Sequence, residues 1–235
     1  MGEGTRLAVE TDFLRSVPLF RELPPEALAA VVRACIERSY DRGQVIFNEE
    51  ETGQTMYIVH SGRVKVSRWL PSGREVILAF HPAGDYFGEM ALIDGQTEPA
   101  TVTAVSSAVI FSLDRSRFLA LLQQQPFAIA LLRELCNRCR EAWKQIALLT
   151  HEAAEARVRM VLHQLCASSG IDTPEGTRID LPLTHRELAS IAGVSRETVT
   201  RVLGHLIEQN LVSVGAGRRL VVLEPKRLLD GACFD

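Results

Sequence analysis

The chain has 235 residues, of which 46% are hydrophobic and 23% are charged, and its formal net charge is −3. This length suffices for two modest domains, each with a core of its own. No apolar run approaches the ~20 residues of a membrane-spanning helix, and the amino terminus MGEGTRLAVETDF lacks the basic and apolar regions of a signal peptide, so a soluble, cytoplasmic protein is expected.

The negative charge is unevenly distributed along the chain. From Ala153 onward ten basic residues balance ten acidic ones, so residues 1–152 carry the whole excess. Between Thr184 and Arg219 five arginines stand against three glutamates. DNA binding through a local basic surface is therefore compatible with an acidic chain, with modest non-specific affinity and a need for dimerisation.

The first half of the chain contains a region rich in short β-type runs. A helical stretch at about 24–38 precedes it, and the region itself extends from Val45 to Leu113. The runs are VIF, MYIVH, RVKVSRW, REVILAF, ATVTAV and AVIFSL, and they alternate with glycine turns at Gly43, Gly53, Gly62, Gly73, Gly84 and Gly95. Strands this short and this closely spaced predict a compact antiparallel barrel or roll.

From Arg115 the pattern becomes helical, and Pro126 is expected to start a long helix. A heptad seam over more than three heptads favours a helix pair between two subunits. A long helix packed on its own roll is the alternative. The seam residues, spaced alternately four and three apart, are Ala128, Leu132, Leu135, Cys139, Ala142, Ile146, Leu149 and Ala153.

A second helix is expected over 154–167, after a domain boundary near His151 to Ala154. The polar stretch SSGIDTPEGTR that follows is typical of a surface loop.

The segment from Leu183 to Leu206, LTHRELASIAGVSRETVTRVLGHL, predicts two short helices joined by a tight turn. Thr184 is expected to cap the first helix, with Glu187 completing a capping box, and Gly193 is expected to form the turn. Ser195 is expected to cap the second helix. The buried face of the second helix repeats at helical spacing, as Val199, Val202, Leu203 and Leu206.

The outer face of the second helix carries polar side chains that suit DNA. In a major groove an arginine can bond guanine O6 and N7 together, and a glutamate can accept a hydrogen bond from cytosine N4. Hydroxyls near helix N-termini can hold phosphates. An ordinary helical hairpin with solvated charges is the alternative. The candidate base readers are Arg196, Glu197, Thr200 and Arg201, and the candidate phosphate contacts are Thr184, Ser195 and Thr198.

Two β-rich runs, LVSV and RLVVL, follow the second helix, which is expected to end near Asn210. The residues between the runs, Gly215 to Arg219, include Arg218 near the tip. This pattern predicts a hairpin wing that touches the DNA backbone. An edge hairpin that only packs is the alternative.

The chain resembles the superfamily of the cyclic-AMP receptor protein and the fumarate–nitrate regulator. The resemblance rests on the order of four parts: the roll with its glycine turns, the FGEMAL segment at 87–92, the long helix and the SRETVTR helix. The resemblance covers nearly the whole chain. It implies an α+β fold with a cyclic-nucleotide-binding-type β-roll over 14–125, a dimerisation helix over 126–152 and a winged helix-turn-helix domain over 153–229. It also implies a homodimer on double-stranded DNA. Matched by position, Arg196, Glu197 and Arg201 would read a palindrome with TGTGA-like half-sites.

The resemblance breaks at the sensor site. In nucleotide-binding members, backbone N–H groups of a short helix attract the cyclic phosphate, a glutamate bonds the ribose 2′-hydroxyl, and an Arg-Ser pair grips the phosphate. Here Glu98 and Pro99 stand where the Arg and Ser are expected. The charge at the phosphate contact is therefore reversed, so Glu98 would repel the phosphate. The missing hydrogen bond from the arginine would cost the complex ~1.5–3 kcal/mol of binding free energy in addition. We therefore expect weak or no binding of cyclic AMP in the usual pose. The candidate ligand-binding residues are Gly88, Glu89, Met90, Glu98, Pro99, Ala100, Thr101 and, on the dimer helix, Trp143.

Three interpretations of the signal stay open. The first is another ligand, such as cyclic di-GMP, bound around Glu89, Glu98 and the dimer helix. The second is a redox or haem sensor, and the third is a regulator without a ligand. The sequence identifies no cofactor.

The cysteines and histidines bear on the second interpretation. Cys136 and Cys139 form a C-x-x-C pair, and Cys139 falls in the heptad seam. A buried free thiol, a redox switch and a metal or cluster site are the alternatives for it. The histidines show no metal-ligand spacing, and haem binding through His60 or His81 stays open.

No catalytic constellation emerges from the sequence, since it contains no phosphate-binding glycine loop with a lysine, no nucleophile elbow and no paired-carboxylate motif. We interpret the chain as a non-enzymatic, homodimeric transcription regulator that binds DNA, with RNA polymerase open as a further partner. A ligand-binding signalling module whose helical tail makes protein contacts is the competing interpretation.

Overall fold

The computed structural model describes residues 3–150, 153–181, 183–215 and 219–229, with side chains from residue 10 onward. The chain divides into two compact units, Met1–Arg140 and Glu141–Asp235. The division falls inside the long helix α5 (Gln125–Thr150), whereas the sequence places a domain boundary near residues 151–154. Across the described ranges, no helix has the length and apolar character needed to cross a membrane.

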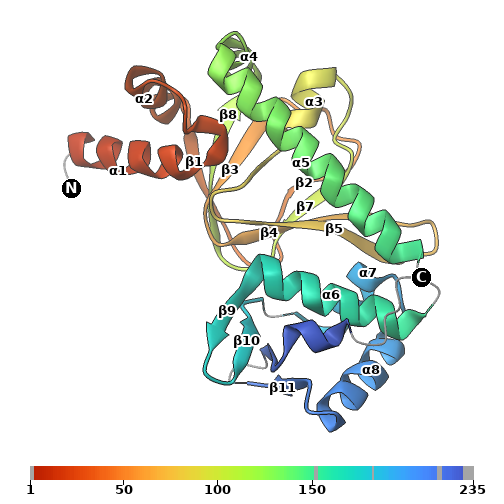
Figure 1. The fold of residues 1–235 in the computed structure, drawn as a ribbon. Helices are drawn as coiled ribbons and strands as arrows, with labels where there is room; N and C mark the ends of the chain where they lie inside the picture. Colours follow the sequence, from red (N-terminus) through yellow and green to blue (C-terminus); the bar gives the residue numbers. More distant parts are fainter. Residues whose placement is uncertain (1–2, 151–152, 182, 216–218, 230–235) are drawn as a thin grey trace. The chain divides into compact units, whose positions relative to one another are not determined.

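The first unit is built around a β-roll of two four-stranded sheets (Figure 1), ordered β1-β8-β3-β6 and β2-β7-β4-β5. Neighbouring strands are antiparallel, so the predicted antiparallel roll is confirmed. Each β-rich run named in the sequence forms a strand. The strands are β1 (Ile36–Tyr40), β2 (Val45–Phe47), β3 (Thr55–Ser61), β4 (Arg63–Trp69), β5 (Glu75–Pro82), β6 (Tyr86–Phe87), β7 (Thr101–Ala104) and β8 (Ala108–Asp114).

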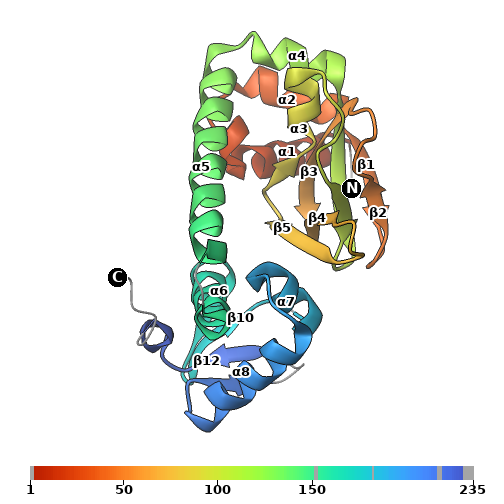
Figure 2. The same ribbon diagram turned by 90° about the vertical axis from the view of Figure 1, so that its right-hand side faces the viewer.

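Helices cover part of the roll, and α2 and α4 lie at one end of it in both ribbon views (Figures 1 and 2). The short helix α3 follows β6 directly, which places the FGEMAL segment at the strand-to-helix junction. The helices of the first unit are α1 (Glu3–Ser16), η1 (Pro18–Phe20), α2 (Pro25–Ala34), α3 (Glu89–Asp94), α4 (Arg115–Leu122) and the first part of α5.

Strand β8 contributes side chains to two hydrophobic cores, one on each face of its sheet. Successive side chains of a strand point to opposite faces. Ile110 therefore packs inside the roll with Phe47 and Phe87. Phe111 packs on the other face, in a cluster that includes the buried Phe118 and residues of α1, α2 and α5.

The second unit contains helices and a four-stranded sheet ordered β11-β12-β10-β9. Its helices α7 and α8 occupy the predicted helix-turn-helix segment, and β11 and β12 form the predicted hairpin, whose tip at 216–218 lies outside the described residues. The elements are the end of α5, α6 (Ala154–Ser169), β9 (Gly170–Thr173), β10 (Gly176–Ile179), α7 (His185–Ala192), α8 (Arg196–Glu208), β11 (Val212–Val214), β12 (Leu220–Val222) and η3 (Pro225–Leu228).

Two elements differ from the sequence-based expectation. The polar stretch expected to be a surface loop forms the hairpin β9–β10, because β10 finds a partner in β12 and extends the sheet of the wing. The helix expected over 24–38 ends at Ala34, and the following residues form β1. Strand β1 is held by antiparallel pairing with β8 and by the Ser112 hydroxyl, which donates to the Ile36 carbonyl at 3.0 Å.

Candidate functional site

The first helix of the helix-turn-helix segment begins where the sequence predicts. The Thr184 hydroxyl accepts from the Glu187 backbone N–H at 3.2 Å, and the Glu187 carboxylate accepts from the Thr184 backbone N–H at 2.8 Å. This reciprocal capping box satisfies two donors that the first turn of a helix leaves free. The Thr184 side chain stays exposed.

The turn between the two helices requires a residue without a side chain. Gly193 adopts a left-handed conformation with φ 63° and ψ 33°, which favours glycine. A Cβ atom there would lie 2.8 Å from the Leu149 Cδ2 atom of α5. The turn is therefore restricted by backbone conformation and by packing together.

Helix α8 also begins and packs as predicted. The Ser195 hydroxyl accepts from the Thr198 backbone N–H at 3.1 Å and lies 3.0 Å from the Thr198 hydroxyl. The predicted buried face is confirmed, since Val199, Val202, Leu203 and Leu206 are at most 3% exposed. One face of α8 is therefore packed against the rest of the second unit, and the opposite face is exposed to solvent.

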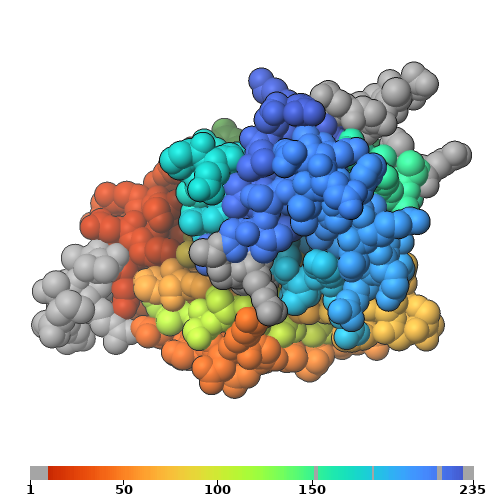
Figure 3. Space-filling view, turned by 90° about the horizontal axis from the view of Figure 1, so that it is seen from below, coloured from red at the N-terminus to blue at the C-terminus, as the bar shows by residue number. Residues whose placement is uncertain are grey.

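The free side carries the predicted base readers. The side chains of Arg196, Glu197, Thr200 and Arg201 are all exposed. Hydrogen bonds from its own backbone N–H and from Ser195 hold the pKa of Glu197 below its usual value, so this carboxylate is ionised and accepts hydrogen bonds at neutral pH. The blue atoms of this part of the chain form a broad surface in Figure 3. The predicted phosphate contact Arg218 lies outside the described residues.

One contact in this region was not predicted. The Nδ1 atom of His185, the first residue of α7, lies 2.9 Å from the hydroxyl oxygen of Thr200 in α8. The same hydroxyl donates to the Arg196 carbonyl at 3.0 Å. His185 therefore restrains the Thr200 side chain, and no local sequence pattern links residues that are 15 positions apart.

The roll contains a cavity of about 80 Å³ that is open to solvent. Most of its lining is apolar, and the polar lining residues are His81, Glu89, Glu98 and Arg138. Of the predicted ligand-binding residues, Thr101 does not line the cavity, and Trp143 belongs to the second unit, where its side chain is 64% exposed. The predicted residues that do line it are Gly88, Glu89, Met90, Glu98, Pro99 and Ala100.

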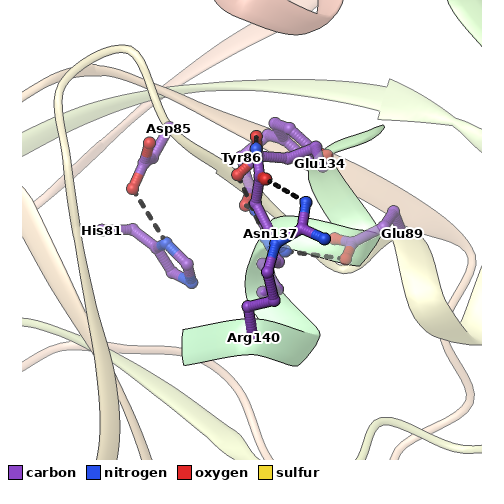
Figure 4. A network of polar contacts seen from close by, with 8 residues as sticks. His81, Asp85, Tyr86, Glu89, Glu134, Asn137 and Arg140 are labelled. Carbon is purple, nitrogen blue, oxygen red and sulfur yellow. Dashed lines mark hydrogen bonds and ion pairs between the residues drawn. The ribbon is translucent and has the colours of Figure 1, made fainter. Parts of the chain in front are cut away.

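One oxygen of the Glu89 carboxylate is paired with an arginine of α5. Glu89 is 1% exposed, and its Oε1 atom accepts from Arg138 Nη1 at 2.8 Å. The other terminal nitrogen of Arg138 donates to the Tyr86 carbonyl at 2.6 Å, and the guanidinium lies 4.4 Å from the centre of the Tyr86 ring. Figure 4 shows this network, in which Glu89 and Tyr86 lie beside Glu134 and Asn137 of α5. Arg138 was not predicted, because its partner is 49 residues away in the chain.

Glu98 is the second buried carboxylate of the cavity, at 4% exposed. Its backbone is anchored to the preceding loop, since its N–H donates to the Glu51 carbonyl at 2.8 Å and its carbonyl accepts from the Glu50 N–H at 2.9 Å. Its side chain lies against Gly53, where a Cβ atom would be 2.5 Å from Glu98 Oε1. Burial, followed by the charge of Glu89, raises the pKa of Glu98 from 4.5 to about 7.

The cysteines and histidines form no metal site among the described residues, where no group of three or more His, Cys, Asp and Glu side chains is placed to hold an ion. Cys136 and Cys139 are exposed free thiols on α5. His81 pairs with Asp85, with 3.1 Å between Nδ1 and Oδ2, and His60 packs between aromatic rings.

Much of the predicted heptad seam of α5 is exposed in the single chain. Leu132 is 62% exposed in the first unit, and in the second unit Ile146 and Leu149 are 59% and 41% exposed. Apolar side chains repeated along one face of an exposed helix mark a surface suited to pairing with another helix.

Comparison with known proteins adds a family relationship to this geometry. Residues 37–125 match the cyclic nucleotide-binding domain, and residues 156–230 match the Crp-like helix-turn-helix domain. The cyclic AMP receptor protein of Thermus thermophilus is 36% identical over 87% of this chain and 92% of its own length. The CRP-like cAMP-activated global transcriptional regulator of Mycobacterium tuberculosis is 29% identical over 92% of this chain and 97% of its own. The structure of FixK2 from Bradyrhizobium japonicum matches with a TM-score of 0.73 and 26% identity, over 83% of this chain and 96% of that one.

Proposed function

This chain belongs to the Crp/Fnr family of bacterial transcription regulators, and from that premise we propose that it acts as a homodimer that reads a palindromic operator with TGTGA-like half-sites. The family consists of DNA-binding regulators and not of enzymes. We assign sensing to residues 14–125, dimerisation to 126–152 and DNA binding to 153–229. The protein would act in the cytoplasm, where the DNA is.

The exposed face of α8 carries the DNA-binding proposal. Arg196 and Arg201 supply guanidinium groups for guanine edges, and Glu197 supplies an ionised carboxylate for cytosine N4. Because the caps and the buried face fix α8 from the other side, these groups are presented on a rigid element. Thr200 completes the face. Phosphate contacts are assigned to Thr184, Ser195, Thr198 and Arg218.

The seam of α5 supports the homodimer. The occupant that suits this face is a second copy of the same helix, because the heptad repeat is complementary to itself under two-fold symmetry. Two-fold symmetry would also present two copies of α8 to successive major grooves, about 34 Å apart.

The cavity of the roll favours a signal other than cyclic AMP bound in the usual pose. The buried Glu98 lines the cavity at the position of the expected arginine. Pro99 offers neither a hydroxyl nor a backbone N–H to the phosphate. One carboxylate oxygen of Glu89, the residue that would contact the ribose, already accepts a hydrogen bond from Arg138.

A gel-shift titration with a TGTGA palindrome tests the DNA-binding proposal. Arg196→Ala should weaken binding to the palindrome about tenfold or more and relax the preference at one base pair, since a bidentate arginine contact is worth ~1–3 kcal/mol. The matched control is Arg227→Ala, which removes an exposed arginine of η3 that pairs with Glu224 and should bind as the wild type does. If Arg196→Ala binds the palindrome as tightly as the wild type, the base-reading assignment is wrong.

A further inference from the structure

Glu98 is a buried acid without a counterion. The buried charged side chains of the described residues are Glu89 and Glu98, and Glu89 is paired with Arg138. Within the described part of the chain, Glu98 has neither a hydrogen bond nor an ion pair through its carboxylate, and its charged neighbours Glu89, Glu51 and Asp94 are all acidic. A buried charge in this situation is costly until a group of opposite charge joins it.

The cavity supplies a suitable setting for such a group. Arg138 is the cation of its lining, and it is already bound to Glu89, so an ionised Glu98 leaves the lining with an excess negative charge. Phe47 and Phe87 line the same cavity, with ring centres 5.8 Å apart. Tyr57 and His81 stack on Phe87, so the two phenylalanines contribute apolar surface to the lining, which suits an uncharged body.

We propose that the roll cavity binds a small organic cation, an ammonium or amidinium group on an apolar body, whose charged end pairs with Glu98. This rests on the proposed function, because the cation would be the signal that the regulator senses. A bare metal ion fits poorly, since no metal-holding group of side chains occurs among the described residues. An anion such as a cyclic phosphate would meet the unpaired carboxylate.

The protonation of Glu98 makes the proposal sensitive to pH. With its pKa raised to about 7, Glu98 carries a proton in part of the molecules at neutral pH, and a bound cation would displace that proton. Affinity for the cation should therefore rise with pH through 7 and change about tenfold between pH 6 and pH 8. The titratable and charged groups that face Glu98 or line its cavity are Glu51, Tyr57, His81, Glu89, Asp94 and Arg138.

Calorimetry with three probes that share a phenyl body tests this proposal. Phenethylamine is the cation, 2-phenylethanol is its neutral analogue and phenylacetate is the anion, all titrated at pH 8 into the full chain. The amine should bind about tenfold more tightly than the alcohol, because a charge-assisted contact adds to the shared apolar burial. Phenylacetate should bind more weakly than the alcohol.

Two variants assign the effect to one carboxylate. Glu98→Gln keeps the shape of the side chain and should make the amine and the alcohol bind equally, with no dependence on pH. Glu75→Gln, which removes a carboxylate that pairs with Lys65 outside the cavity, should keep the preference for the amine. Circular dichroism checks that both variants fold.

Several outcomes would overturn the proposal. These are equal affinity for the three probes, tighter binding of phenylacetate, a preference for the amine that survives Glu98→Gln, or no binding of the amine up to about 10 mM. The gel shift with the palindrome is independent of these titrations. If the palindrome is bound and the amine is not, the cation proposal fails and the DNA-binding proposal stands.

Discussion

The guanidinium of Arg138 lies 2.8 Å from the buried carboxylate of Glu89 and joins helix α5 to the start of α3. The ion pair is supported by a bond from Arg138 to the Tyr86 carbonyl and by the Tyr86 ring. A carboxylate as buried as Glu89 is tolerated when its charge is paired and hydrogen-bonded. Arg138 therefore supplies the counterion that allows the Glu89 carboxylate to be buried.

Removing Arg138 should destabilise the first unit. In Arg138→Ala the buried Glu89 loses its partner, and the free energy of unfolding should fall by about 2–4 kcal/mol, measured by urea denaturation. Arg140→Ala removes an exposed arginine that bonds Asn137 and should change stability by less than about 0.5 kcal/mol. The double variant Glu89→Gln/Arg138→Ala should regain part of the loss. If Arg138→Ala and Arg140→Ala are equally stable, the ion pair has no structural role.

Glu98 should make stability fall as pH rises. The pKa of Glu98 is 4.5 in the unfolded chain and about 7 in the folded protein. Between these two pH values the folded state binds more protons than the unfolded state, so the free energy of unfolding falls as the pH rises. The difference amounts to roughly 2–4 kcal/mol when complete above pH 7. Glu98→Gln lacks this term, so its stability relative to the wild type should rise between pH 4.5 and pH 8. A difference in unfolding free energy between the two proteins that stays constant from pH 4.5 to pH 8 would contradict the raised pKa of Glu98.

Two glycines of the DNA-binding unit should respond in opposite directions to alanine. Gly193→Ala places a Cβ atom in a left-handed turn and 2.8 Å from Leu149 Cδ2, so we expect a loss of about 1–2 kcal/mol. Gly204 lies inside α8, and a Cβ atom at this position would have no neighbour within 4 Å, so Gly204→Ala should stabilise the helix by about 0.5–1 kcal/mol. Thermal denaturation monitored by circular dichroism gives both values. Equal effects of the two changes would refute the role given to the turn.

The seam of α5 should be sensitive to charge at Ile146. Ile146→Glu introduces a charge into the predicted helix pair and should produce monomers in analytical ultracentrifugation and lose affinity for the palindrome. Ala147→Glu introduces the same side chain at the next exposed position, outside the seam, and should remain dimeric. A dimer in both variants would show that α5 is not the dimer contact.

The helix-turn-helix segment could be predicted in detail because its signals are local. The capping box of Thr184 and Glu187, the turn at Gly193 and the cap at Ser195 each involve residues within a few positions of one another. The roll was predictable for a related reason, since its strands alternate with glycine turns and bury alternate residues.

Other features depend on contacts between distant parts of the chain. Arg138 pairs with Glu89, 49 positions away, and His185 contacts Thr200, 15 positions away. In neither case does the local sequence indicate the partner. The hairpin at 170–179 was expected to be a loop because its residues are polar, and it becomes part of a sheet through its pairing with β12. Strand β1 likewise depends on β8.

A calorimetric titration with cyclic AMP tests most directly the claim that this regulator keeps the DNA-binding end of its family and has changed the sensing end. The wild type should give no binding heat up to about 1 mM ligand, because Glu98 opposes the phosphate and Pro99 cannot bond it. Glu98→Arg/Pro99→Ser restores the expected pair and should bind measurably under the same conditions. Binding of cyclic AMP to the wild type with a Kd in the micromolar range or tighter would contradict the account.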